Sequence, residues 1–376
     1  MLSLYVHIPF CVGKCQYCGF YSTLYTSRGA DDFIVALRRE AEHYRSDLIK
    51  RKFKTVYLGG GTPTVLAGDQ LTLVNDIIRE HFTVEDDAEF TVEANPNSVT
   101  RERLALLIRL GVNRLSLGVQ SFSDAVLQVL GRRHTAEQAV HAFALAREAG
   151  FRNIGIDLIY GIPGQTMRQW DETLDSVAAL SPEHVSAYSL SLDEGSPFHH
   201  KAAAGGLILP DDDIVARMYE LAVRKLDTVG YRRYEISNFS RTGFECRHNM
   251  NYWERGEYLG LGPGAWSFIS GRRHANIADE TEYARRLSIG TSVIETDEVV
   301  GTESAAREAI LLGLRTMKGL DLPRFEREYG CDLLSRLERN TAPLRDAGLL
   351  LEQEGALMLS DRGILLSNEV IARLAV

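Results

Sequence analysis

The sequence predicts an α/β protein whose core is a parallel sheet covered by helices. Short β-rich runs alternate with segments in which apolar residues recur every three or four positions. Polar motifs follow directly after several of these runs, where parallel sheets place their functional sites. The expected strands are Leu2–His7, Thr55–Leu58, Glu89–Glu93, Arg114–Val119, Ile154–Ile159 and Val185–Leu190.

Helices are expected between these strands, at Asp31–Ile49, Gln70–Glu80, Arg101–Leu110, Ala136–Ala149 and Met167–Leu180. Six β–α steps with right-handed crossovers build either a doubly wound sheet or a partial (β/α)6 barrel. In both arrangements the carboxyl ends of the strands meet on one rim. Gly59–Pro63, Glu93, Gln120 and Asp157 end or lie in successive strands, so we expect them to share a site.

The remainder of the chain predicts two smaller regions. A Tyr-, Trp- and Gly-rich stretch from Tyr231 to Phe268 follows a helix at Ile214–Val229, and we interpret it as an α+β addition to the core. Helices at Ser304–Met317, Pro323–Tyr329 and Leu333–Ala347 then precede a hairpin, as in a small winged-helix-like domain. We therefore predict a core over residues 1–210, an added region over 211–300 and a C-terminal domain over 301–376.

Composition narrows the function classes. The 376 residues carry a formal net charge of −9, from 42 basic and 51 acidic residues, and thus lack the basic surface of a nucleic-acid-binding protein. No apolar run approaches the roughly 20 residues of a membrane helix. The first residues lack the basic and apolar regions of a signal peptide. We expect a cytoplasmic protein that does not bind nucleic acid.

Three of the five cysteines fall within eight residues, in Cys11-Val-Gly-Lys-Cys15-Gln-Tyr-Cys18. This number and spacing fit metal ligation better than a disulfide framework. Such a loop, directly after an apolar strand, can place three thiolates on one face of a 4Fe–4S cluster and leave one iron open to chelate a small molecule. Structural zinc, with His7 as a fourth ligand, and a redox disulfide of the C-x2-C part are the alternatives.

The C-x3-C-x2-C loop resembles the signature of the radical SAM superfamily. Gly59-Gly-Gly-Thr-Pro63 resembles that superfamily's motif for the methionyl amino group of S-adenosylmethionine (SAM), and it lacks the lysine of a phosphate-binding Walker loop. The resemblance implies that the reduced cluster passes one electron to SAM, which releases methionine and a 5′-deoxyadenosyl radical.

Further motifs resemble the oxygen-independent coproporphyrinogen III oxidase-like (HemN-like) family over essentially the whole chain. They are Leu4-Tyr-Val-His-Ile-Pro-Phe-Cys11, Val-Glu93-Ala-Asn-Pro, Gly-Val-Gln120-Ser-Phe, Gly-Arg132-Arg-His and Ile-Asp157-Leu-Ile-Tyr-Gly-Ile-Pro. The resemblance implies a partial (β/α)6 radical SAM barrel. It also implies that SAM is contacted by Tyr5, Tyr17, Gly60, Gly61, Thr62, Glu93, Gln120, Arg132, Asp157 and Ser191. Carboxylates there would accept from ribose hydroxyls or the amino group, and arginine would pair with the methionyl carboxylate.

Two features distinguish the subgroup that the chain resembles. The oxidase pattern continues to a fourth cysteine, C-x3-C-x2-C-x-C, whereas Gly19 and Phe20 follow Cys18 here. Phe20 and the run His248-Asn-Met-Asn-Tyr-Trp253 resemble the heme-chaperone (HemW) subgroup. This resemblance implies that His248 is an axial ligand of heme and that the motif's two aromatic rings face the porphyrin. Cys246 is a further candidate heme ligand, and we interpret His199, His200 and Cys331 as structural residues.

The leading hypothesis is a heme chaperone that binds heme as cargo and transfers it to an acceptor protein, with a 4Fe–4S cluster and SAM as cofactors. The acceptor is not identified, a membrane-associated one being an option, and an electron donor must reduce the cluster. The competing hypotheses are oxidative decarboxylation of coproporphyrinogen III, a related radical SAM methyltransferase or heme-degrading enzyme, and a zinc-binding module without enzymatic activity. The missing fourth cysteine argues against the decarboxylase.

Overall fold

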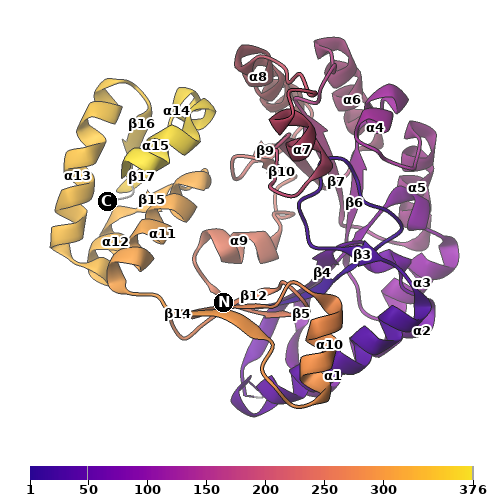
Figure 1. Ribbon diagram of the computed structural model, residues 1–376. Coiled ribbons are helices and arrows are strands. Elements are labelled where there is room, and N and C mark those ends of the chain that lie inside the picture. Colours follow the sequence, from indigo (N-terminus) through magenta and orange to yellow (C-terminus); the bar gives the residue numbers. More distant parts are fainter. Residues whose placement is uncertain (49, 375–376) are drawn as a thin grey trace.

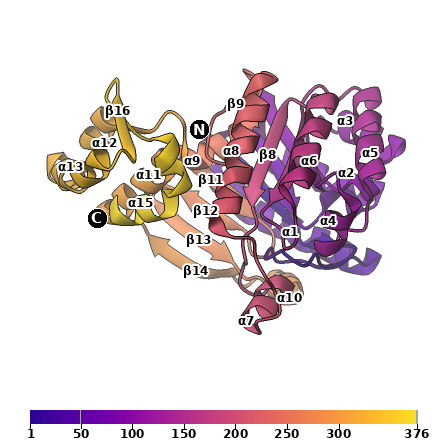
Figure 2. The same ribbon diagram turned by 90° about the horizontal axis from the view of Figure 1, so that it is seen from above.

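The computed structural model describes residues 1–48 and 50–374, and a large mixed sheet forms its centre (Figure 1, Figure 2). The strand order is β14-β13-β12-β11-β1-β4-β5-β6-β7-β8-β10-β9. The bounds are β1 (Leu2–Ile8), β4 (Lys52–Gly60), β5 (Thr83–Ala94), β6 (Arg114–Gln120), β7 (Ile154–Tyr160), β8 (His184–Ser189), β9 (Arg232–Arg233), β10 (Asn238–Ser240), β11 (Glu257–Leu261), β12 (Trp266–Ile269), β13 (Arg272–Asn276) and β14 (Ile294–Val299). A separate short pair joins β2 (Phe10–Cys11) to β3 (Thr23–Leu24).

The six predicted strands are β1 and β4 to β8, which run parallel and lie side by side in chain order. Sequential order with helices outside is the arrangement of a partial barrel rather than a doubly wound sheet, so the α/β prediction is confirmed in its barrel form. β11 adds a further parallel strand beside β1, and β12 to β14 continue the sheet in antiparallel pairs.

Helices cover the outer face of the parallel strands (Figure 1). The helices up to residue 288 are, in chain order, α1 (Ser27–Leu48), α2 (Gly68–His81), α3 (Arg101–Arg109), α4 (Asp124–Val129), α5 (Ala136–Ala149), α6 (Met167–Leu180), α7 (Pro197–Ala203), α8 (Asp212–Thr228), α9 (Arg247–Trp253) and α10 (Glu280–Ser288), and α9 does not belong to the outer layer. Short 3-10 turns follow β4 at Pro63–Val65 and β5 at Pro96–Ser98. The helix predicted over 31–49 is α1, although Ile49 itself lies outside the described residues. None of the described helices has the length and apolar character needed to cross a membrane.

Local sequence explains where two central helices begin. The side chains of Thr135 and Thr166 each accept a hydrogen bond from the backbone amide three residues later. In turn, the side-chain oxygens of Gln138 and Gln169 accept a hydrogen bond from the amides of Thr135 and Thr166. These reciprocal bonds satisfy amide groups that a helix start otherwise leaves open. Trp170, in the first turn of α6, is fully buried and donates to a carbonyl of α8 at 2.8 Å.

The inner face of the barrel is polar, because alternate strand residues point inward. In β6, Arg114, Ser116 and Gln120 line an internal cavity, whereas Leu115 and Leu117 belong to the apolar core. The strands are therefore buried on both faces but apolar on only one. This arrangement builds a polar chamber inside the barrel.

The C-terminal helices form a group beside the barrel (Figure 1). The elements are α11 (Thr302–Arg315), β15 (Leu320–Asp321), α12 (Leu322–Tyr329), α13 (Cys331–Asp346), β16 (Leu350–Gln353), β17 (Ala356–Leu359), α14 (Asp361–Leu365) and α15 (Ser367–Leu374). Three helices followed by the hairpin of β16 and β17 match the predicted winged-helix-like pattern. The amide of Ile236 donates to Arg315, and Arg233 pairs with Asp361, which joins this group to the barrel. The boundaries at residues 210 and 300 stay predictions.

One buried carboxylate makes fold stability depend on pH. Glu40 of α1 accepts hydrogen bonds from the Gly262 amide at 2.8 Å, from Asn276 Nδ2 at 2.5 Å and from the Tyr283 hydroxyl at 2.6 Å. Burial raises the pKa of Glu40 to about 7. A raised acid pKa favours the folded state at low pH, so this contribution is lost as the pH rises from the ordinary glutamate value through 7.

We therefore expect the unfolding free energy to fall by about 3 kcal/mol over this range on account of Glu40. Glu40→Gln should make the unfolding free energy depend less steeply on pH. Denaturant unfolding of the reconstituted protein between pH 5 and 8 measures this dependence. Glu42→Gln, an exposed position on the same helix, is the matched control. Equal slopes in all three proteins would contradict this account of Glu40.

Candidate functional site

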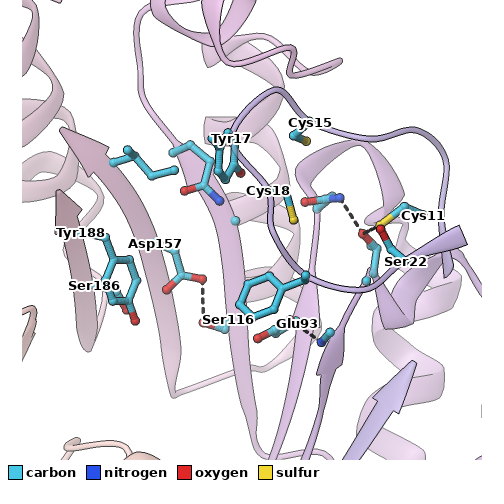
Figure 3. Close-up of a pocket in the computed structure, with 18 of the residues that line it drawn as sticks. Cys11, Cys15, Tyr17, Cys18, Ser22, Glu93, Ser116, Asp157, Ser186 and Tyr188 are labelled. Carbon is cyan, nitrogen blue, oxygen red and sulfur yellow. Dashed lines mark hydrogen bonds between the residues drawn. The ribbon is translucent and has the colours of Figure 1, made fainter. Parts of the chain in front are cut away.

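A cavity of about 390 Å³ lies under the cysteine loop, at the carboxyl ends of the parallel strands (Figure 3). Most of the predicted cluster and SAM residues border it. They are Cys11, Cys15, Tyr17, Cys18, Gly60, Gly61, Thr62, Glu93, Gln120, Arg132, Asp157 and Ser191. The structure thus brings together residues from the cysteine loop and from strands far apart in the sequence.

The three cysteines are free thiols on one loop that arches over the cavity (Figure 3). Burial raises the pKa of Cys11 and of Cys18. Cys11 Sγ lies 3.7 Å from Thr62 Oγ1, and Arg132 donates to Cys15 Sγ at 3.5 Å. Among the described residues, no three His, Cys, Asp or Glu side chains converge on the position of a single metal ion. A cubic cluster does not need such convergence, because each iron takes its own thiolate.

The glycine loop after β4 packs directly beneath the cysteine loop. Gly60 has a φ of 101°, which favours glycine, and a Cβ there would lie 2.5 Å from the ring of His7. A Cβ on Gly61 would lie 2.5 Å from the carbonyl oxygen of Phe10, and the Thr62 amide donates to the same carbonyl at 2.7 Å. Side chains at the two glycine positions would therefore clash with His7 of β1 and with the backbone of Phe10, just before the cysteine loop.

Two half-buried carboxylates, Glu93 and Asp157, point from the strands into the cavity (Figure 3). Glu93 accepts from the Tyr57 hydroxyl at 2.7 Å and from the Gly60 amide at 3.2 Å, and burial raises its pKa to about 7. Asp157 accepts from the Ser116 hydroxyl at 3.0 Å, and burial raises its pKa as well. A carboxylate has about four acceptor positions, so each can also accept from the hydroxyl or amino groups of a ligand.

Arg132 and Gln120 complete the wall near the cysteines. Arg132 donates to Asn95 Oδ1 at 2.6 Å, and its buried Nε has no hydrogen-bond partner among the described residues. Arg132 lines the cavity, and a guanidinium in such a place suits an anionic ligand group. Gln120 has a φ of 68°, where the pairing of β6 with β7 breaks. Such strained residues cluster at functional sites.

Three predicted residues lie at the margin of this cavity or outside it. Ser191 is exposed at the edge of this cavity, and its hydroxyl donates a hydrogen bond to Asp193 at 2.7 Å. Tyr5 does not line the cavity; its hydroxyl lies 3.1 Å from His7 Nδ1, and its ring borders a second cavity. His248 lines neither cavity.

Arg114 is a cavity residue that the sequence motifs did not identify. Only 2% of it is exposed, and its Nε lacks a hydrogen-bond partner among the described residues. Burial opposes its charge, but neighbouring Cys246 and Glu89 raise its pKa above the ordinary value. Further lining residues without a sequence prediction are Ser22, Tyr57, Asn95, Ser116, Ser186, Tyr188 and Asn249. The alternation of polar and apolar residues in Arg-Leu-Ser-Leu-Gly-Val-Gln is the signal that could have revealed Arg114 and Ser116.

The helix that carries the His-Asn-x-x-Tyr-Trp motif, α9, is anchored inside the barrel by Glu89. This buried carboxylate accepts from the amides of Arg247 and His248, at 3.0 and 3.1 Å, and from Cys246 Sγ at 3.5 Å. A carboxylate at a helix start satisfies open amides and balances the helix dipole. Cys246 is fully buried there, and burial raises its pKa to about 12.

His248 is held by hydrogen bonds at both ring nitrogens. Nδ1 lies 2.8 Å from Thr55 Oγ1, and Nε2 lies 2.8 Å from Tyr252 Oη. Burial lowers the pKa of His248 to about 3, so the ring is neutral near pH 7. In this conformation neither nitrogen is free to coordinate iron. The role of His248 as heme ligand stays a prediction, and it requires the ring to leave one of these partners.

His248→Ala should lower the unfolding free energy by about 2–4 kcal/mol, because the buried Thr55 hydroxyl and the half-buried Tyr252 hydroxyl lose a partner and a void is left. Denaturant unfolding measures this loss, and exposed His43→Ala is the control. Unchanged stability of the His248 variant would show that the ring is not a structural support. Loss of heme from this variant counts as evidence of ligation only if the variant keeps its fold.

Comparisons with known proteins identify the family to which the chain belongs. The family model for the radical SAM superfamily matches residues 5–177, and the model for the HemN C-terminal domain matches residues 302–366. The heme chaperone HemW of Bacillus subtilis (strain 168) is 38% identical over 98% of this chain and 98% of its own length. The chain belongs to the HemW family of radical SAM proteins.

Other relatives in the HemW family support the same assignment. The heme chaperone HemW of Mycobacterium tuberculosis (strain H37Rv) is 37% identical over 99% of this chain and 94% of the relative. The solved structure of coproporphyrinogen III oxidase (HemN) from Escherichia coli, described as a radical SAM enzyme, aligns with a TM-score of 0.88 and 27% identity. It covers 100% of this chain and 90% of the oxidase. The HemW-family chain therefore shares its fold with a porphyrinogen oxidase.

Proposed function

We propose that this protein is a heme chaperone, which binds heme and delivers it to an acceptor protein. The observation that carries the proposal is the 38% identity to a heme chaperone HemW over 98% of both chains. Similarity over the full length includes the C-terminal domain and the aromatic region, and not only the barrel that radical SAM proteins share. The heme acceptor, its association with a membrane and the electron donor that reduces the cluster belong to the same proposal.

A 4Fe–4S cluster on Cys11, Cys15 and Cys18 and SAM in the first cavity fit the residues present. The three thiols border one chamber, and the remaining cavity residues offer two carboxylates and a guanidinium. When bound, the reduced cluster supplies one electron to SAM. Arg132 would pair with the methionyl carboxylate, and Glu93 and Asp157 would accept from the amino and hydroxyl groups.

Coproporphyrinogen III decarboxylation is the second candidate, because the fold aligns over its whole length with the oxidase HemN. Phe20 argues against it. Where the oxidase pattern has its fourth cysteine, this side chain is 66% exposed and lines the first cavity. A phenyl ring offers neither a thiol nor a proton at that place.

Anaerobic reconstitution followed by separate addition of heme and of coproporphyrinogen III tests the proposal. We expect the Soret band to shift as heme binds stoichiometrically. When an apo-hemoprotein is added, heme should pass to it, and the Soret band should become that of the hemoprotein. The porphyrinogen should keep its mass in the presence of SAM and dithionite. Stepwise loss of carbon dioxide would make the protein an oxidase, and failure to bind heme would overturn the chaperone proposal.

A further inference from the structure

A second cavity of about 710 Å³ lies between the added strands of the sheet and the C-terminal domain. One wall comes from β1 and the end of the cysteine loop, and a second comes from α9 and β11 to β13. Helix α11 closes the remaining side with Glu308 and two leucines. Pockets of roughly 300–1,000 Å³ are typical of sites that hold cofactors and drug-sized molecules.

The walls of this cavity are mainly aromatic and partly open to solvent. Trp266 is 47% exposed, and Tyr252, Trp253 and Phe268 stand beside it in the lining. Aromatic rings bury much area and favour stacking on another flat π system. Exposed aromatic surface inside a concave site favours a large planar ligand over a small polar one.

The charges in the lining favour a ligand with two carboxylates. Arg255 and Arg273 both reach Glu308, at 2.9 and 2.6 Å, and both guanidinium groups lie over the ring of Phe268. The cavity lining thus holds two arginines and one carboxylate, although Arg273 also reaches Glu298 outside it. Glu308 takes one donor of each guanidinium and Glu298 takes a second one of Arg273. Because each guanidinium has five donors, both arginines keep N–H groups for a further anionic group.

We propose that this second cavity is the heme site, with the macrocycle against Trp266, Tyr252 and Trp253 and the two propionates on Arg255 and Arg273. The proposal rests on the heme-chaperone function and names the place where the cargo is held. A flat aromatic surface with two guanidinium groups beside it matches a planar molecule that carries two carboxylates.

Phe20 connects this site to the cluster site. It lines both cavities and therefore lies at their common border. Heme in the second cavity would lie beside the cysteine loop without entering the chamber of Glu93 and Asp157. The two cavities can then be filled at the same time.

Removal of the propionate charges gives the sharpest test. The full reconstituted protein is titrated with heme and with heme dimethyl ester, and binding is followed at the Soret band. The double variant Arg255→Gln, Arg273→Gln should bind heme about 10-fold or more weakly, with a much smaller change for the ester. Arg272→Gln is the matched control, because this neighbouring arginine is exposed, pairs with Asp297 and does not line the cavity.

A second pair of variants does not depend on the ion pairs with Glu308. Trp266→Glu places a negative charge on the aromatic wall at an exposed position, and should weaken heme binding by about 10-fold or more. Val299→Glu makes a comparable change at a residue that is 74% exposed on β14 and lies outside the lining, and should bind heme as the wild type does. Equal iron content and unfolding curves verify that each variant is folded.

The outcomes separate the two proposals. If the wild type does not bind heme, the chaperone function fails. If the wild type binds heme and both the double arginine variant and Trp266→Glu bind it equally well, the heme site lies elsewhere while the function stands. Variants that hold heme normally but no longer pass it to an acceptor would assign the cavity to the acceptor protein and overturn the inference.

Discussion

Serine in place of Cys11, Cys15 or Cys18 should leave the reconstituted protein almost without iron. The wild type should hold about four irons and four sulfides per chain, with the broad charge-transfer absorption of a cluster. Each of these three thiols borders the same cavity, and a serine hydroxyl is a poor replacement for a thiolate. Iron and sulfide analysis, with electron paramagnetic resonance of the dithionite-reduced protein, measures the loss.

Cys331→Ser is the matched control for this experiment. Its thiol is exposed on α13, in the C-terminal domain, so full iron content is expected. A variant of the cysteine loop that kept four irons would point to a different ligand. Zinc in place of iron in the wild type would revive the zinc-binding alternative.

Glu93→Gln should lower the affinity for SAM by about 10- to 100-fold while the cluster remains. A hydrogen bond to a charged group is worth about 1.5–3 kcal/mol, and the amide of glutamine is neutral and turns a donor toward the ligand. Equilibrium binding of SAM to the reconstituted, unreduced protein measures the change. Asp157→Asn should have an effect in the same direction, since its carboxylate faces the same chamber.

Asp86→Asn is the control for the Glu93 variant, because it neutralises an exposed acid on the same strand, β5. Its SAM affinity should equal that of the wild type. If Glu93→Gln binds SAM normally, the ligand does not use this carboxylate and the assignment of the first cavity to SAM is wrong. If iron content falls as well, the substitution has disturbed the cysteine loop and Asp157→Asn decides the question.

Periodicity alone predicted the elements of the barrel, because their causes are local. Ala136–Ala149 and Met167–Leu180 were predicted with the bounds that the structure has, since the apolar spacing of a helix lies within each segment. Rim positions such as Glu93 and Asp157 followed from the rule that parallel strands end on one side. The prediction that these residues bind SAM came from the resemblance of their motifs to those of a known family.

Long-range pairing could not be predicted in this way. β11 joins the sheet beside β1, with Leu2 opposite Glu257, and nothing in either segment specifies a partner so distant in sequence. His248 is a similar case, because its motif does not reveal that Thr55 and Tyr252 occupy both ring nitrogens. Tyr5 lies close to the cysteines in sequence, yet its ring borders the second cavity.

The second cavity draws its walls from two separate parts of the molecule. β11 to β13 belong to the hydrogen-bonded sheet that also carries the barrel, whereas α11 belongs to the C-terminal group. A small displacement of α11 would therefore widen the cavity without altering the geometry around the cysteine loop. If heme is held in this cavity as proposed, its release would depend on the packing of α11 against the sheet, and not on the geometry of the cysteine loop.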